Sequence, residues 1–476
     1  MGLQRCHRVA IVALLLALSI TGWLVLVVVR PAGAQQSPSS ENPPSSESPA
    51  PSDSATGSST LQEFLRGSSA AISGNPGAVD VLTGTGMLGR FLGFGPDTGV
   101  RLGGMWIGAA DYLFAGGNDP RTWSFNSLLL VDLNLDLEKL LRIPGAEFGA
   151  EFLHFNGSSK NGLNTNGLAG SVTGYNGLPG PPPLNRSELY ELWWRQRLFD
   201  DKLIIRIGKT VPSFDFGNVV RPVSTPDESL AIPAVSSLIY KPVFVSTSML
   251  GIMPGYYDSA YGVTITVAPT TNFYVSLGAY DGNVARGVET GLRAGPEFNG
   301  YYFAIGEVGY AWRLGPDGLP GSVGVGGWGQ TGQLTATSRD GSTFTQNGVK
   351  GIYAFVSQRL WLRSPGVDNS GLSGYFQFGI SDAETIPGRT SLGAGLTGFG
   401  LIPGRPRDSI GAGVSATWLN QRLGLRNTEV LLAAYYQAHV IADIYLQPTL
   451  TFIPNPGASP KLSPATAITL QATILF

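Results

Sequence analysis

The sequence has 476 residues and a net charge of −2, and 13% of its residues are charged, about half the usual share of roughly a quarter. Its aromatic content of 10% excludes a chain that is disordered throughout, and the near-neutral charge without a basic block argues against a nucleic-acid partner. The single cysteine, Cys6, excludes disulfides and cysteine-based metal sites in the rest of the chain. A glycine-rich, aromatic-rich, charge-poor chain of this kind is typical of all-β proteins.

The N-terminus carries the features of an export signal. A basic stretch at 5–8 precedes the apolar run 9–29, and Ala32-Gly33-Ala34 follows it. We interpret residues 1–34 as a signal peptide that is cleaved before Gln35. The apolar run is long enough to span a bilayer, so an uncleaved anchor is the alternative.

Two segments of different composition follow the signal peptide. Residues 35–60 are almost entirely Ser, Pro, Gln, Glu, Ala and Asn, which predicts a disordered linker because little apolar surface is available for burial. Residues 61–98 are interpreted as an N-terminal arm. The arm contains Gly84-Thr-Gly-Met-Leu-Gly89, which matches GxGxxG, but no strand precedes it. A flexible arm is therefore favoured over a nucleotide site.

From residue 99 onward, segments of about ten residues alternate apolar with polar side chains, which is the signal of a strand. In residues 130–138 one face carries Val131, Leu133, Leu135 and Leu137, and the other carries Asp132, Asn134, Asp136 and Glu138. A secreted chain with this pattern predicts an outer-membrane barrel, in which the apolar face contacts lipid and the polar face lines water. The terminal Phe476 lies on the apolar face of the last strand, as expected of a substrate of the barrel-assembly machinery.

The pattern predicts an all-β transmembrane antiparallel β-barrel over residues 99–476, with about 16 strands and both ends in the periplasm. The expected strands lie at 100–114, 122–138, 147–156, 187–199, 202–211, 260–268, 273–281, 299–313, 321–330, 348–362, 371–381, 391–402, 409–419, 429–440, 443–453 and 465–476.

Short and long connections are expected to alternate, with the short ones on the periplasmic side. The short ones are 143–145, 200–201, 269–272, 315–321 and 441–443. The long ones are 157–186, 212–259, 282–298 and 331–347. The connection 212–259 contains buried-type residues such as Phe244 and Met249, so we expect it to fold against the inner wall. Packing on other outer loops as a cap is the alternative.

The hairpin 188–211 places charges of both signs on the predicted lumen face. Such a lining can exchange hydrogen bonds with sugar hydroxyls, and an aromatic side chain can stack on a pyranose ring. The alternative is that the charges pair with one another and that the aromatic residues belong to interface girdles. No catalytic constellation, metal-ligand spacing or cofactor motif is visible. The candidate pore-lining residues are Glu191, Trp193, Arg195, Arg197, Arg206, Lys209, Asp215, Glu307 and Trp328.

An ordered set of motifs resembles the carbohydrate-selective porin family of the OprB type over residues 88–476. The first is Asp132-Leu-Asn-Leu-Asp-Leu-Glu-Lys139 with Pro144-Gly145-Ala-Glu-Phe, and the second is 188–216 with Arg206-Ile-Gly-Lys209 and Asp215-Phe216. Later matches are Tyr280-Asp-Gly-Asn283, Gly326-Gly-Trp328, Pro403-Gly-Arg-Pro-Arg-Asp408, Leu446-Gln-Pro448 and Asn455-Pro-Gly457.

The resemblance implies a sixteen-stranded channel in the Gram-negative outer membrane for passive, carbohydrate-preferring diffusion, without a cofactor. Its partners would be small carbohydrates, outer-membrane lipid and, through Phe476, the barrel-assembly machinery. A homotrimer and a monomer both fit. The alternatives are a general or anion-preferring porin, suggested by the arginines of the hairpin, and a structural barrel that residues 35–60 tether to the cell wall.

Overall fold

The structure is a computed structural model that describes residues 84–179, 183–217, 247–254, 258–286, 296–365, 368 and 370–476. These residues all belong to one compact unit, Ala55–Phe476. The predicted signal peptide (1–34), the predicted linker (35–60) and the first part of the arm lie outside the described residues.

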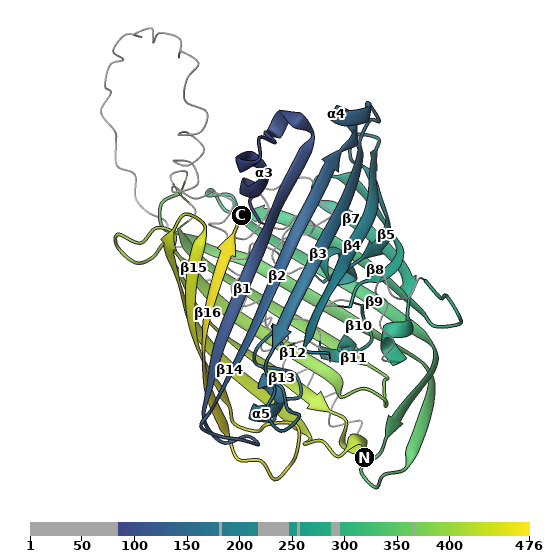
Figure 1. The fold of residues 1–476 in the computed structure, drawn as a ribbon, viewed down its shortest axis with the longest axis vertical. Helices are drawn as coiled ribbons and strands as arrows, with labels where there is room; N and C mark the ends of the chain where they lie inside the picture. Colours follow the sequence, from purple (N-terminus) through teal and green to yellow (C-terminus); the bar gives the residue numbers. More distant parts are fainter. Residues whose placement is uncertain are drawn as a thin grey trace. The chain divides into compact units, whose positions relative to one another are not determined.

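Sixteen antiparallel strands close into a barrel, and each strand pairs with its neighbours in the sequence (Figure 1). β1 completes the circle by pairing with β16. All sixteen predicted strands are thereby confirmed. Their bounds are β1 Val100–Ala115, β2 Thr122–Asp136, β3 Ala146–Gly157, β4 Asn185–Leu198, β5 Leu203–Thr210, β6 Ala260–Thr270, β7 Phe273–Asp281, β8 Tyr302–Leu314, β9 Leu319–Thr337, β10 Thr343–Leu362, β11 Gly371–Ser381, β12 Gly388–Phe399, β13 Ser409–Leu419, β14 Thr428–Ile441, β15 Ile444–Ile453 and β16 Ala465–Leu475.

The exposed faces of the strands are apolar, and the polar side chains lie inside, together with some buried apolar ones such as Met105 and Leu128. On β15, Gln447 and Thr449 are buried, whereas the alternate residues Leu446 and Leu450 are exposed. In a closed barrel the buried side of this alternation faces the lumen and the exposed apolar side faces lipid. The predicted polarity of the strands is therefore correct.

The helices in the described residues are short. They are α3 (Met87–Phe91), α4 (Leu137–Leu141), α5 (Thr165–Ala169) and α6 (Pro212–Asp215), with 3-10 turns η2 (Pro96–Thr98), η6 (Thr247–Met249), η7 (Asn283–Arg286) and η8 (Gln421–Leu423). None of the helices in this described part is long and apolar enough to cross a membrane.

The end of β2 differs from the sequence prediction, which continued the strand to residue 138. The strand ends at Asp136, because the Asp136 Oδ1 accepts hydrogen bonds from the N–H groups of Glu138 and Lys139, both at 3.1 Å. This is an N-cap, and it starts α4 at Leu137. The alternation of leucines is compatible with both structures over so short a segment.

The short turns lie on the predicted side, but three connections at the other end of the barrel are also short. All five predicted short turns lie at the end of the barrel that holds α4 and the C-terminus, and α5 lies at the other end (Figure 1). However, the predicted long connection 331–347 is wrong, because β9 and β10 extend as a paired hairpin to Thr337 and Thr343. Short connections also occur at the opposite end, at 116–121 and 382–387.

The described end of the arm is docked on the barrel, where the sequence predicted a flexible segment. The Phe476 carbonyl accepts hydrogen bonds from the N–H groups of Thr85 (3.2 Å) and Gly104 (2.8 Å). Gly84 and Gly86 adopt positive φ, and a Cβ on Gly84 would lie 2.0 Å from the Gly104 carbonyl oxygen. The glycines of the GxGxxG match therefore allow close approach of two backbones.

Candidate pore constriction

Arg206 on β5 lies at the centre of a charged cluster on the inner wall. Its Nη2 lies 2.5 Å from Asp215 Oδ2, and its Nη1 lies 3.9 Å from Glu191 Oε1. Its guanidinium also lies over the Trp193 ring, 5.9 Å from the ring centroid. Asp215 belongs to the start of the β5–β6 connection, so four of the predicted site residues come together where that connection leaves the wall.

Glu191 organises the neighbouring backbone. Its carboxylate accepts hydrogen bonds from the Val211 N–H at 2.8 Å and from Trp193 Nε1 at 3.3 Å. The sequence placed Tyr190 on the opposite face from Glu191, but both side chains are buried. The register between β3 and β4 shifts beside Glu151, which leaves Tyr190 as the additional residue of a bulge.

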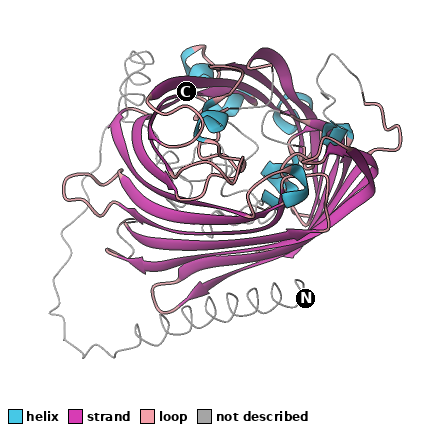
Figure 2. Cartoon of the chain, turned by 90° about the horizontal axis from the view of Figure 1, so that it is seen from below, coloured by secondary structure: helices cyan, strands magenta, loops and turns pink. Residues whose placement is uncertain are grey.

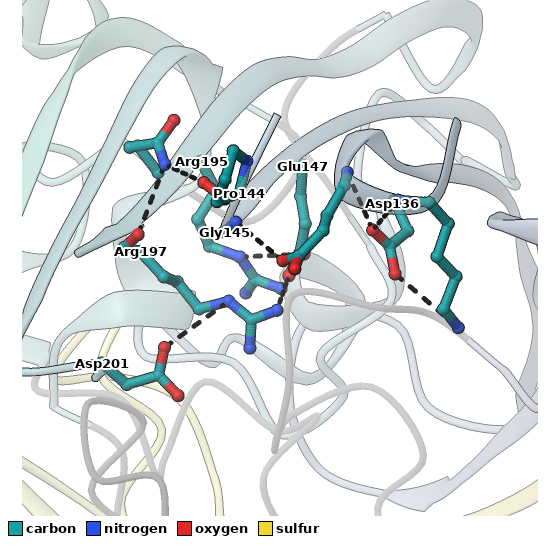
Figure 3. Close-up of polar contacts among 10 residues, drawn as sticks. Asp136, Pro144, Gly145, Glu147, Arg195, Arg197 and Asp201 are labelled. Carbon is teal, nitrogen blue, oxygen red and sulfur yellow. Dashed lines mark hydrogen bonds and ion pairs between the residues drawn. The ribbon is translucent and has the colours of Figure 1, made fainter. Parts of the chain in front are cut away.

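Two further arginines of the inner wall share one acidic partner (Figure 3). Arg195 and Arg197 converge on Glu147 of β3: Arg195 bonds Glu147 Oε2, and Arg197 Nη2 lies 2.7 Å from Oε1. Arg195 also stands directly opposite Arg206 in the β4–β5 pairing. Like charges that face each other across strands are unfavourable. The carboxylates of Glu147 and Asp215 offset this repulsion between Arg195 and Arg206.

Glu307 on β8 anchors the β5–β6 connection. Its carboxylate accepts hydrogen bonds from the Gly217 N–H (2.7 Å), the Tyr274 hydroxyl (2.5 Å) and the Tyr353 hydroxyl (2.6 Å). These three donors occupy the acceptor sites of a buried carboxylate. Glu307 therefore holds the start of the β5–β6 connection.

The other described end of the same connection also lies on the inner wall. The Thr247 hydroxyl is 2.9 Å from the Thr417 hydroxyl of β13, and Met249 and Ile252 are buried. The described ends of this connection thus contact inward-facing residues on two separated parts of the wall, and residues 218–246, with Phe244, lie outside the described residues. Loops and short helices lie inside the ring of strands (Figure 2).

The β3–β4 connection also enters the lumen, which the sequence did not reveal. Asn176 Nδ2 bonds both carboxylate oxygens of Asp111 on β1, at 2.9 and 2.8 Å. Glu429 on β14 accepts hydrogen bonds from residues 171–173. Leu178 packs in a buried apolar cluster with Met105 and other inward-facing residues of β1–β3. The described parts of two connections therefore contact the inner wall at different strands.

The wall formed by β11–β16 carries few charges. Among the buried side chains that the structure describes on β11–β16, Glu429 is the one charged residue. The buried polar side chains beside it carry hydroxyl or amide groups, for example Gln377, Thr397, Ser415, Gln437, Gln447 and Gln471, and they are interspersed with buried apolar ones such as Leu431 and Ala433. The charged strip on β3–β5 therefore shares the lumen with a wall of neutral hydrogen-bonding groups.

Two predicted site residues lie apart from the cluster around Arg206. Lys209 is buried, and its Nζ donates to the Leu189 carbonyl at 2.7 Å. Trp328 on β9 belongs to a buried aromatic group, with its ring centroid 6.2 Å from that of Phe303. A Cβ on Gly351 would lie 2.7 Å from the Trp328 ring, so the ring lies flat on the adjacent strand.

The comparisons with known proteins agree with this architecture. The profile of the carbohydrate-selective porin, OprB family, matches residues 127–476. The chain belongs to this family. It is 23% identical over 407 residues to Porin B of Pseudomonas aeruginosa, covering 77% of this chain and 85% of that protein. The high-pH structure of Pseudomonas putida OprB superposes with a TM-score of 0.65 at 19% identity, covering 80% of this chain and 95% of that chain.

Family membership and the closed sixteen-stranded barrel together identify a porin of the Gram-negative outer membrane. The exposed apolar residues of the strands, such as Leu277 and Leu450, form the surface that a lipid bilayer requires.

Proposed function

We propose that this porin passes small neutral carbohydrates by passive diffusion and that it selects them between the charged strip on β3–β5 and the neutral wall. It has no catalytic role in this proposal. The observation that supports it best is the hydrogen-bonding state of Arg206. Within the described part of the chain, the buried Nε and Nη1 of Arg206 have no hydrogen-bond partner.

A guanidinium with unused donors suits a sugar hydroxyl, and because Arg206 is 3% exposed the proposal requires that the solute reach this buried side chain. These N–H groups belong to the rigid, planar guanidinium of Arg206, which Asp215 and Trp193 hold in one orientation. A hydrogen bond from a charged donor contributes about 1.5–3 kcal/mol, which is enough to offset the loss of water from a hydroxyl. Trp193 adds an apolar face beside the same donors.

The neutral wall gives the solute its second set of partners. Hydroxyl and amide side chains both donate and accept, as sugar hydroxyls do. A polyol can therefore replace its hydration shell on both sides of the channel, whereas an ion finds compensating groups on one side alone. This favours neutral polar solutes.

The anion-preferring alternative is weaker than the count of arginines suggested. Arg195 and Arg197 pair with Glu147, and Arg206 pairs with Asp215. These acids offset most of the positive field that an anion filter would need. Contacts with the barrel-assembly machinery through Phe476, and an assembly as monomer or trimer, remain part of the proposal.

Purified protein in planar bilayers tests the function. We expect defined conductance steps whose current is reduced by hexoses in a concentration-dependent manner. Liposome-swelling rates with sugars of increasing size, compared with amino acids of matched size, should then rank sugars first. Equal rates for the two solute classes at each size would support a general porin, and an absence of conductance would support a structural barrel.

A further inference from the structure

Glu429 of the inner wall accepts hydrogen bonds from two connections of the chain. It is 1% exposed. Oε1 accepts hydrogen bonds from Ser171 Oγ at 2.9 Å, from the Thr173 N–H at 2.9 Å and from the Thr173 hydroxyl. Oε2 accepts from the Val172 N–H at 3.0 Å and from the Gly457 N–H at 2.6 Å.

This network binds three chain segments at one point. The β3–β4 connection supplies residues 171–173, β14 supplies Glu429, and the β15–β16 connection supplies Gly457. A Cβ on Gly457 would lie 2.7 Å from Glu429 Oε2, so the glycine of the Asn455-Pro-Gly457 motif makes room for the carboxylate. Within the described residues no ion pair involves Glu429, and its charge is met by the converging N–H and O–H donors.

The anchored segment occupies the lumen. Beyond residues 171–173, Asn176 bonds Asp111 and Leu178 packs on the inward-facing apolar residues of β1–β3. Backbone and side-chain hydrogen bonds within the segment, such as those from the N–H groups of Tyr175 and Asn176 to Asn166 Oδ1, make it a rigid unit. A rigid unit that is fixed to the wall at one end keeps its place in the channel.

We propose that Glu429 is a positioning residue that fixes the β3–β4 connection in the lumen and thereby sets the channel width. The inference rests on the passive-channel function proposed above. Loss of the carboxylate leaves several donors without an acceptor, and the connection moves away from the wall. The channel then widens and its contacts with solutes weaken.

Two replacements of Glu429 test the role at graded strength. Glu429→Gln keeps the shape and one acceptor oxygen, and Glu429→Ala removes both. Single-channel conductance should rise severalfold in Glu429→Ala, with a smaller rise in Glu429→Gln, and sugar block of the current should weaken in the same order. The matched control is Glu384→Gln, since Glu384 is an exposed carboxylate at the same end of the barrel that pairs with Arg422 at 2.8 Å.

A thiol reporter detects the movement directly. In a Cys6→Ser background, Leu178→Cys is the only thiol of the chain, and Leu178 is 1% exposed. We expect slow maleimide labelling with Glu429 present and much faster labelling in Glu429→Ala. Heat-modifiable migration on gels shows that each variant has a folded barrel.

The outcomes separate this inference from the proposed function. Folded Glu429 variants with unchanged conductance and unchanged labelling of Leu178→Cys would overturn the positioning role. If Glu429→Ala gives no folded barrel, Glu429→Gln and Gly457→Ala decide the question by the same two measurements. If the variants widen the channel but the parent protein shows no block by sugars, the positioning role stands and the carbohydrate preference fails.

Discussion

Arg206 and Asp215 lie 2.5 Å apart, and this contact joins the wall strand β5 to the connection that leaves it. Thr264 Oγ1 donates to the same Asp215 oxygen at 2.8 Å, so β6 shares the contact. Gly217, two residues further along, is bonded to Glu307. The inward course of the β5–β6 connection is therefore set within its first few residues, beside the guanidinium that we assign to solute binding.

Replacement of Arg206 tests the solute site. Arg206→Ala should raise single-channel conductance and increase the sugar concentration for half-block about tenfold, which corresponds to the loss of about 1.4 kcal/mol from a charged hydrogen bond. Arg422→Ala at the exposed rim is the control and should leave both quantities unchanged. If Arg206→Ala and Arg195→Ala both behave like the parent protein, the constriction lies elsewhere.

Glu147 should control ionic preference. Glu147→Gln removes the negative charge between Arg195 and Arg197, so the local field becomes more positive. The reversal potential in a salt gradient should shift toward anion permeability, with a larger shift at low ionic strength because screening is weaker. Asp317→Asn in an exposed periplasmic turn serves as the matched charge control. A reversal potential identical to that of the control would contradict the placement of the arginine pair in the ion path.

Leu277 tests which face of the wall meets lipid. This side chain is 59% exposed at the middle of β7, and Leu277→Arg should destabilise the barrel in lipid vesicles by about 2–4 kcal/mol. Leu141→Arg makes the same substitution at an exposed position of α4, where the charge stays in water, and should cost little. Denaturant titration of the two variants in vesicles gives the difference.

Deletion of Phe476 should impair assembly. Its N–H donates to the Gly104 carbonyl at 2.9 Å and its carbonyl accepts from Gly104 and Thr85, so the residue joins β1, the end of β16 and the arm. The yield of heat-modifiable barrel in outer-membrane fractions should fall sharply, whereas Phe476→Tyr, which keeps the aromatic ring, should retain it. Normal yield from the deletion would argue against a terminal signal.

The processing of the N-terminus is a separate prediction. Mass spectrometry of protein from the outer-membrane fraction should detect a first peptide that begins at Gln35. An intact peptide that contains Cys6, recovered from the inner membrane, would refute cleavage and favour the anchor.

The sequence alone was sufficient for the number, order and polarity of the strands. The two-residue alternation of apolar and polar side chains indicates which face of each strand meets lipid. Because this pattern depends only on neighbouring residues, it also predicted the face that carries Arg206 and Glu191. The prediction was wrong for Tyr190, because a bulge shifts the alternation by one residue and the composition of the strand does not reveal it. It failed also at Asp136, where a cap ends β2 inside an unbroken alternation.

Only the tertiary structure decided which of these polar residues are available to a solute. Glu307 and Glu429 share the local pattern of a pore-lining carboxylate, yet each accepts hydrogen bonds from a connection distant in the sequence, Gly217 in one case and residues 171–173 in the other. Alternation assigns a side chain to a face of its own strand. It carries no information on which loop returns to that face, because loop placement depends on long-range hydrogen bonds and packing.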